Sequence, residues 1–235
     1  MMVDVTTNAS CQFLRSTMDP NLAQHIAHAF LPSRWHFYYT RSKLHTDPLY
    51  DGVCAALRDT HAPVLDLGCG IGLLAHCLRG LGLTQPYLGV DNDMGKIELA
   101  QQVMQRAQLH DVQFDTVNLA QHFPAHRGSV VLLDVLQYLP PTMQQACLEQ
   151  ACRCITPGAR LVIRTGLSDP GWRSTVTRAA DLAARAIRWM NTGPKQYPTR
   201  EQLTAAFAQH GLRGQFQPLW GNTPFNNWLV VAALD

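Results

Sequence analysis

Residues 64–72, with the sequence V-L-D-L-G-C-G-I-G, constrain the fold of this chain more than any other stretch. The first four residues are mostly apolar, as in a buried parallel strand. Three glycines then alternate with other residues, and glycine lets a backbone turn sharply and approach a ligand closely. Apolar residues at helical spacing continue from Ile71 to Leu78. The order of strand, glycine turn and helix predicts a nucleotide-type binding loop.

The spacing of the glycines argues against a dinucleotide. Gly68 and Gly70 need a third glycine at position 73 to complete the G-x-G-x-x-G pattern, and residue 73 is Leu. Asp66 stands on the strand just before the first glycine, where a carboxylate repels a pyrophosphate and attracts a cationic amino-acid group. A tight turn without a ligand is the structural alternative, and the buried acid before three spaced glycines disfavours it.

A second acid lies at a distance that suits a ribose. Asp91 ends the apolar run 87–90 and follows Gly72 by 19 residues. A carboxylate about 20 residues after such a loop accepts hydrogen bonds from ribose hydroxyls. Asp91 could instead cap the next helix, but Asp93 suits that role better, which leaves Asp91 for the ligand.

The pattern D-x-G-x-G-x-G, followed by the acid after the second strand, resembles the class I S-adenosylmethionine (SAM) methyltransferases. The resemblance covers residues 60–235. It implies S-adenosyl-L-methionine as the cofactor and a Rossmann-like α/β fold. That fold has a mostly parallel seven-stranded sheet with helices on both faces, an N-terminal helical lid and a helical insertion after strand five. It assigns cofactor binding to Asp66, Gly68, Cys69 and Gly70 for the methionine end, Asp91 for the ribose, Asn92, Asn118 and Leu119 around the adenosine, and Asp134 near the transferable methyl group.

Two of these positions carry open alternatives. Asn118 is the candidate for the adenine amino group, and Asp115 takes that role if the third strand ends earlier. Asp134 ends the fourth strand, at the edge where α/β sheets bind ligands, or is a surface carboxylate. Methylases of exocyclic base amines usually carry Asn/Asp-Pro-Pro-Tyr/Phe at this tip. Here Val135 and Leu136 follow Asp134, which argues against methylation of DNA amino groups.

Composition narrows the class of protein further. The 235 residues are 46% hydrophobic and 15% charged, enough for one domain with a sizeable core. A formal charge of +2 does not indicate a nucleic-acid partner. We expect neither a transmembrane segment nor a secretory leader, since no long apolar run occurs. Seven irregularly spaced cysteines predict free thiols and a cytoplasmic protein. The ten histidines form no metal-binding motif, so no metal is expected.

Strand and helix patterns alternate through the centre of the chain. This repetition predicts a parallel sheet with right-handed crossovers. The strands are expected at 63–67, 86–90, 112–117, 129–134, 159–165, 214–219 and 227–233, and the helices at 20–30, 48–58, 70–81, 94–108, 142–154, 172–190 and 200–210. We expect a single domain made of a lid (1–60), a SAM-binding core (61–166), a helical insertion (167–198) and a last helix with two strands (199–235).

Two segments outside the core are candidates for the substrate side. Residues 31–46 are aromatic and basic, and small-molecule methyltransferases fold such a segment over SAM. Arg41 or Lys43 then pairs with the SAM carboxylate, and the ring of Tyr38 or Tyr39 faces the sulfonium. The alternative is aromatic packing of an N-terminal helix.

The second segment is the amphipathic stretch 172–190, which carries four arginines on one face. Its apolar face is expected to cover the acceptor pocket. Its basic face is either solvated or docks an acidic carrier protein or an anionic membrane surface.

These observations predict a SAM-dependent methyltransferase for a small or carrier-bound acceptor. Residues 37–44, 165–167 and 225–228 are similar to methyltransferases of aryl-polyene pigment biosynthesis, which implies an aromatic hydroxyl or ring carbon in secondary metabolism. No residue is identified as a general base. A non-catalytic SAM-binding protein and an NAD(P)-dependent oxidoreductase are the alternatives, and Leu73 argues against the latter.

Overall fold

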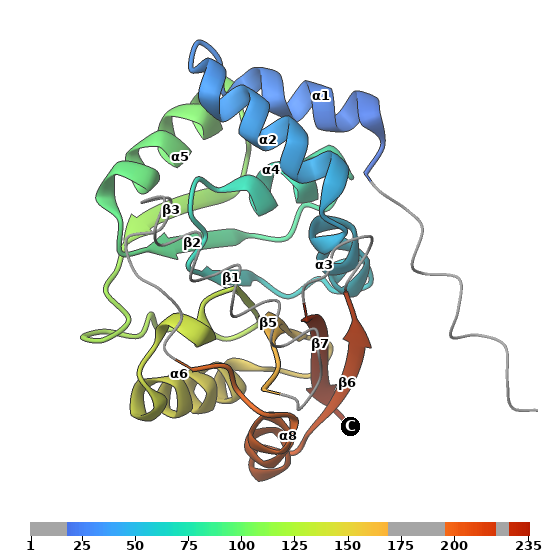
Figure 1. Cartoon of the computed structure of the whole chain (residues 1–235), viewed down its shortest axis with the longest axis vertical. Helices are drawn as coiled ribbons and strands as arrows, with labels where there is room; N and C mark the ends of the chain where they lie inside the picture. Colours follow the sequence, from blue (N-terminus) through green and yellow to red (C-terminus); the bar gives the residue numbers. More distant parts are fainter. Residues whose placement is uncertain (1–17, 169–195, 220–225) are drawn as a thin grey trace, which may run out of the picture.

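The computed structural model describes residues 18–168, 196–219 and 226–235, which form a seven-stranded sheet with helices on both faces (Figure 1). The strand order is β3-β2-β1-β4-β5-β7-β6. The strands are β1 (Val64–Leu67), β2 (Tyr87–Asp91), β3 (Val112–Thr116), β4 (Ser129–Leu133), β5 (Leu161–Gly166), β6 (Leu212–Pro218) and β7 (Asn227–Leu234). The predicted Rossmann-like α/β fold is confirmed.

The sheet combines a parallel half with an antiparallel end. The first five strands pair in parallel, whereas β7 runs antiparallel between β5 and β6. Strand β1 pairs with β2 on one side and with β4 on the other, so the strand order reverses beside it. The crevice at the carboxyl ends of such strands is the usual ligand site of an open α/β sheet.

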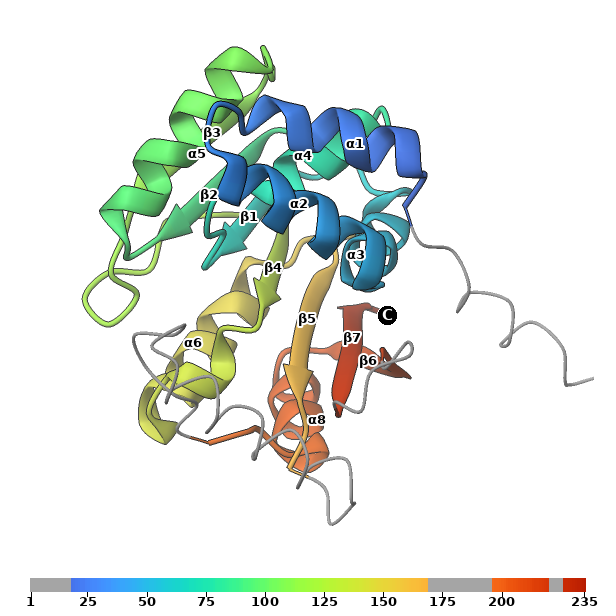
Figure 2. The ribbon, with the colours of Figure 1, turned by 45° about the horizontal axis from the view of Figure 1, so that its top comes forward.

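The two faces of the sheet bury two separate hydrophobic clusters. Side chains of α1, α3, α4 and α5 pack with Val64 and Tyr87 on one face. Side chains of α6 and α8 pack with Leu65 and Leu67 on the other, as the alternation of side chains along a strand requires. Figure 2 shows these two helical layers above and below the sheet. The helices are α1 (Pro20–Ala29), α2 (Arg34–Thr46), α3 (Leu49–Leu57), α4 (Leu73–Gly80), α5 (Met94–Arg106), η1 (Leu136–Tyr138), α6 (Pro141–Cys154) and α8 (Arg200–Gln209).

Residues 31–46, for which the sequence indicated no periodicity, contain the helix α2. Ser33 is its N-cap, and the Ser33 hydroxyl accepts a hydrogen bond from the His36 backbone N–H. Only Thr40 and Leu44 are fully buried on this helix, while Trp35 and Tyr38 are more than half exposed. The exposed aromatic residues mask the helical spacing of the buried ones.

Other helices begin close to the predicted positions. Asp19 caps α1 as a side-chain acceptor, and Thr199 forms a capping box with Gln202 at the start of α8. The helix predicted from residue 70 begins at Leu73 instead, because Gly70 and the N-cap Gly72 both have positive φ. The helix predicted at 172–190 lies outside the described residues.

Candidate active site

A cavity of about 160 Å³ opens at the carboxyl ends of β1 and β4. It is bounded by the glycine loop between β1 and α4, and on the opposite side by α2 and α3. The lining residues are Tyr39, Lys43, Leu49, Tyr50, Asp66, Gly68, Cys69, Gly70, Ile71, Leu73, Leu74, Leu133 and Asp134. The sequence predicted Asp66, Gly68, Cys69, Gly70 and Asp134 to bind the cofactor, and the fold brings these five residues to one cavity.

The glycine loop is shaped by residues that accept positive φ. Gly68 has φ of 79°, and a Cβ on it would lie 2.5 Å from the Cγ2 of Val135. Gly70 has φ of 57°, and a Cβ there would meet no atom within 4 Å. The backbone N–H groups of Gly68 and Cys69 both donate to the carbonyl of Val90, which fixes the loop against β2. Gly70 therefore presents bare backbone to open space, as close approach of a ligand requires.

Asp66 lies beside this loop and is almost fully buried, with 1% of its surface exposed. The Tyr87 hydroxyl on β2 donates a hydrogen bond to its Oδ2, while its Oδ1 is buried and has no hydrogen-bond partner among the described residues. Burial raises the pKa of the Asp66 carboxyl to about 7. A buried carboxylate oxygen without a partner is costly. The ammonium of a SAM methionine end is a group of the right charge to compensate it, so these residues fit the cofactor.

Asp91 is held at the other side of the loop. Its Oδ2 accepts from the Gly70 backbone N–H at 3.0 Å, and its Oδ1 accepts from the Asp93 N–H at 3.0 Å. Asp93, in turn, caps α5 by accepting from the Lys96 N–H at 3.2 Å. The division of roles between Asp91 and Asp93 is therefore as predicted for the cap. Each Asp91 oxygen has further lone-pair capacity, which is compatible with ribose hydroxyls.

A buried arginine that the sequence analysis did not single out contacts Asp134, one of the residues that line the cavity. Arg164 on β5 is 8% exposed and forms ion pairs with Asp134 and with Asp47, the latter at 3.5 Å. Burial alone would lower the pKa of Arg164, but the two carboxylates outweigh it and raise that pKa. Asp134 has φ of 60°, unusual for a residue with a side chain.

Asp47 connects Arg164 to the N-terminal helices α2 and α3. Its carboxylate binds Lys43 at 2.6 Å and accepts from the Leu49 N–H at 3.0 Å, at the start of α3. Burial favours a higher pKa for Asp47, but the charges of Arg164 and Lys43 outweigh it and lower that pKa. The pair with Lys43 joins residues four apart in the chain, whereas the pair with Arg164 joins residues that are distant in the chain.

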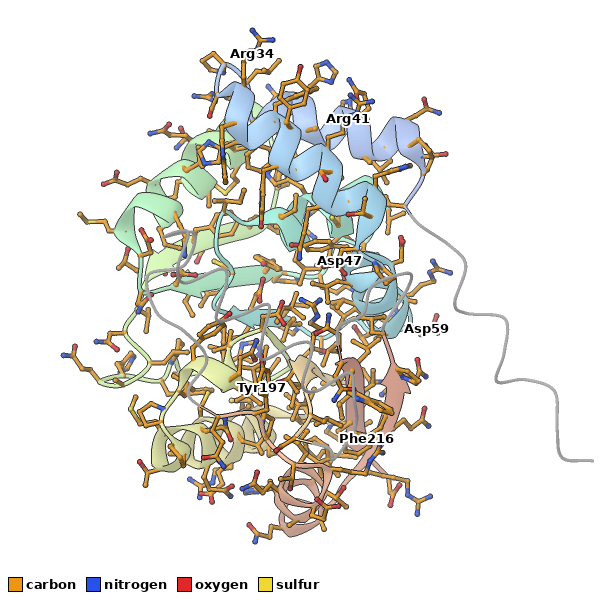
Figure 3. All side chains as sticks on the ribbon, in the orientation of Figure 1. Arg34, Arg41, Asp47, Asp59, Tyr197 and Phe216 are labelled. Carbon is orange, nitrogen blue, oxygen red and sulfur yellow. The ribbon has the colours of Figure 1, made fainter. Side chains whose placement is uncertain are left out.

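The cation of α2 that faces the cavity is Lys43. Arg41, also predicted for cofactor binding, is exposed and does not line the cavity. Figure 3 shows Arg41 on the outer helical layer with Arg34, and Asp47 nearer the centre of the molecule. On an α-helix, residues two apart point to different sides, which separates Arg41 from Tyr39 and Lys43.

The residues predicted around the adenosine lie outside the cavity. Asn92 and Asn118 are exposed, and the Asn118 Oδ1 accepts from the Ala120 N–H at 3.0 Å. Leu119 packs against the hydrophobic cluster of the α6 face. Their assignment to the adenosine stays a prediction.

In the part of the chain that the structure describes, no group of three His, Cys, Asp or Glu side chains is placed to hold a metal ion. None of the described helices has the length and apolarity to cross a membrane.

Comparison with known proteins decides the family. A family model described as a methyltransferase domain matches residues 48–215, well over half of the chain. The chain belongs to the class I SAM-dependent methyltransferases. Its sheet order, with an antiparallel β7 inserted beside β6, is the arrangement typical of this class. The cofactor of this methyltransferase is therefore SAM, as the glycine loop and Asp66 indicated.

Two curated relatives each match less than half of this chain. It is 29% identical over 119 residues to a ubiquinone biosynthesis O-methyltransferase of Thiobacillus denitrificans, matching 46% of this chain and 47% of that protein. A second such enzyme, from Paracidovorax citrulli, is 32% identical over 106 residues, 43% and 42% of the two chains. The chain thus spans about half the length of the curated relatives that it matches.

A solved structure supports the fold independently. Magnesium protoporphyrin IX methyltransferase from Synechocystis PCC 6803, solved with bound S-adenosylhomocysteine (SAH), superposes with a TM-score of 0.60 at 17% identity. The match covers 91% of this chain and 85% of that one. At this identity the likeness shows the fold alone.

Proposed function

We propose that this methyltransferase transfers a methyl group from SAM to a hydroxyl oxygen of a small molecule. The buried Asp66 oxygen, which has no partner within residues 18–168, 196–219 and 226–235 and lies beside a glycine loop that opens on the cavity, is the observation that carries the cofactor side. The similarity to two ubiquinone biosynthesis O-methyltransferases supports an oxygen acceptor. The resemblance of residues 37–44 to aryl-polyene methyltransferases supports an aromatic acceptor, free or bound to a carrier protein.

The cavity residues have distinct roles in this proposal. Asp66 compensates the cofactor ammonium, and Lys43 pairs with the cofactor carboxylate. The backbone of the glycine loop lies against the methionine chain, and Asp91 accepts hydrogen bonds from the ribose. The rings of Tyr39 and Tyr50 line the same cavity and are suited to a cation–π contact with a sulfonium.

Methyl transfer needs alignment more than acid–base chemistry. SAM supplies a methyl group already activated on a sulfonium. The protein then has to orient the acceptor and exclude water, and proximity alone can supply about 7–11 kcal/mol of the barrier reduction. The carboxylate of Asp134 is paired with the guanidinium of Arg164. We therefore assign Asp134 to positioning at the β4 tip and assign no general base.

The first experiment separates binding from turnover. Mass spectrometry of the purified protein identifies bound small molecules, and calorimetric titration with SAH compares the wild type with Asp91→Ala. We expect SAH to bind and the variant to bind on the order of 100-fold more weakly, because two ribose hydrogen bonds to a charged group are lost. A wild type without affinity for SAM or SAH would refute the proposal.

Turnover is then measured with phenolic and carrier-bound acceptors, by following SAH formation. We expect methyl esters to be absent and methyl ethers to form on at least one aromatic hydroxyl. SAH binding without turnover of any acceptor would favour a non-catalytic SAM-binding protein.

A further inference from the structure

Tyr87 is a buried tyrosine whose hydroxyl bonds a group of the binding site. It is the first residue of β2, is 3% exposed, and its hydroxyl donates to Oδ2 of Asp66. Asp66 pairs with Gly89 in the sheet, so Asp66, Tyr87 and Gly89 share one face. The Tyr87 ring also meets the Phe114 ring edge-on, at 5.9 Å between centroids. Packing and pairing thus fix the position of the Tyr87 hydroxyl.

This hydrogen bond divides the Asp66 carboxylate into two unequal oxygens. Oδ2 is occupied by Tyr87, whereas Oδ1 is buried and has no partner in the part of the chain that the structure describes. A hydroxyl that donates to a carboxylate stabilises the charged form and restricts rotation of the group. The free oxygen is consequently the one left for a ligand in the cavity that Asp66 lines.

We propose that Tyr87 is a positioning residue that fixes the Asp66 carboxyl with Oδ1 directed at the cofactor ammonium and favours its ionised form when the ammonium binds, so that cofactor binding is coupled to the loss of one proton from Asp66. The proposal rests on the proposed function, since it needs a SAM-type ligand in the cavity. Atoms and charge balance simply: the Asp66 O–H bond breaks, the proton goes to solvent, and an ammonium–carboxylate pair forms.

The surroundings of Asp66 bring the loss of its proton close to neutral pH. Burial is the largest cause that raises the pKa of Asp66 to about 7, the Tyr87 hydrogen bond lowers it, and the charge of Asp91 raises it further. Burial also raises the pKa of Tyr50, Tyr87 and Cys69, which therefore stay protonated as the pH rises through neutrality. The other charged or titratable side chains that face Asp66 across the cavity are Lys43, Tyr39 and Asp134.

The affinity for SAH should therefore decrease at acidic pH. Below about pH 7 the free protein carries a neutral Asp66, and its proton has to leave before the ammonium is compensated. The affinity for SAH then falls about tenfold for each pH unit below that value, and it is constant above it up to the pH at which the amino group of the ligand loses its own proton. Removing the Tyr87 hydroxyl removes a bond that favours the charged form, which moves the break point to higher pH.

Calorimetric titration of the full chain with SAH tests the proposal, from about pH 5.5 to about pH 8.5. Running it in two buffers of different ionisation enthalpy counts the protons released. We expect about one proton released at pH 6 in the wild type and none in Asp66→Asn. We expect the break point of Tyr87→Phe to lie roughly one pH unit above that of the wild type. Tyr38→Phe is the control, because Tyr38 is 54% exposed and does not line the cavity, and its break point should stay at the wild-type value.

Adenosine, which lacks the amino-acid end, provides a control ligand whose affinity should not change across this range. A wild type that binds SAH without releasing a proton would overturn the proposal, and so would Tyr87→Phe with an unshifted break point. If Tyr87→Phe fails to fold, the proton count of the wild type against Asp66→Asn still decides the coupling. Failure of SAH to bind at any pH would instead refute the proposed function, on which the coupling depends.

Discussion

Two carboxylates at the rim of the same cavity have opposite electrostatic surroundings. Asp134, after β4, is paired with the buried Arg164, which also binds Asp47. Asp66, at β1, has a single tyrosine hydroxyl on one oxygen, and no described residue bonds the other. Both positions were predicted from the sequence as cofactor contacts, and only the structure distinguishes their electrostatic states.

This difference indicates that Asp134 belongs to the structural framework of the cavity, whereas Asp66 is the group that binds a ligand. A carboxylate whose charge is balanced inside the protein has little to gain from a ligand, because binding would have to break an existing pair. A buried carboxylate left uncompensated gains the most from a cation. The β4–β5 side therefore holds the shape of the cavity, whereas the β1 side supplies a large part of the attraction for the cofactor.

Removing the arginine should give the largest effect on stability. Arg164→Met leaves Asp47 and Asp134 without their shared partner, and breaking a buried pair costs about 3–5 kcal/mol of the free energy of unfolding. Urea unfolding monitored by circular dichroism measures it. Arg213→Met is the control, because Arg213 is 78% exposed where it pairs with Asp235, and we expect a loss below about 1 kcal/mol. Equal losses in both variants would show that Arg164 is not the structural centre of the β4–β5 side.

Asp66→Asn should have the opposite effect on stability and make the ligand-free protein more stable. The pKa of Asp66 is about 7 in the folded protein against an ordinary 3.8, so the folded state binds the extra proton between these values. Stability then falls as the pH rises from about 4 to about 7 and stays low above. Because asparagine does not ionise, the ligand-free variant should be more stable than the wild type at pH 8 by on the order of 2–4 kcal/mol, and similar to it near pH 4. A difference independent of pH, in urea unfolding at both values, would contradict the electrostatic interpretation.

The smallest effect concerns two cations of α2, Lys43 and Arg41. Lys43→Met should weaken SAH binding roughly three- to tenfold, since Lys43 lines the cavity and is only partly shielded from water. Arg41→Met, on the same helix but exposed, should change the affinity by less than about twofold. Calorimetric titration of both variants ranks them. A larger loss of affinity for SAH in Arg41→Met than in Lys43→Met would show that Arg41, and not Lys43, contacts the cofactor carboxylate.

The parts of the site that local sequence determines were predictable. Three spaced glycines after an apolar run have few other conformational uses, and Asp66 and Asp91 follow from their distances to that loop. The alternation of strand and helix patterns likewise led to the α/β fold, with boundaries displaced by a few residues. Each of these signals depends on neighbours within one β-α unit.

The remaining features depend on contacts between distant segments. Helix α2 escaped prediction because its aromatic residues are exposed on several sides. Arg164 left one clue, a charge within the apolar strand L-V-I-R-T-G, but nothing local identifies Asp47 and Asp134 as its partners. The bond from Tyr87 to Asp66 depends on the register of β1 against β2, which no sequence pattern gives.

The insertion of β7 between β5 and β6 has a consequence for how the chain is made. Strand β6 joins the sheet only through β7, yet β7 comes later in the chain. On the ribosome, β5 and β6 therefore emerge before the strand that pairs with both of them. Until residues 227–234 arrive, β5 keeps an open edge that another chain could occupy, and such edges favour aggregation. The antiparallel end is thus the segment whose completion a chaperone would have most reason to protect during synthesis.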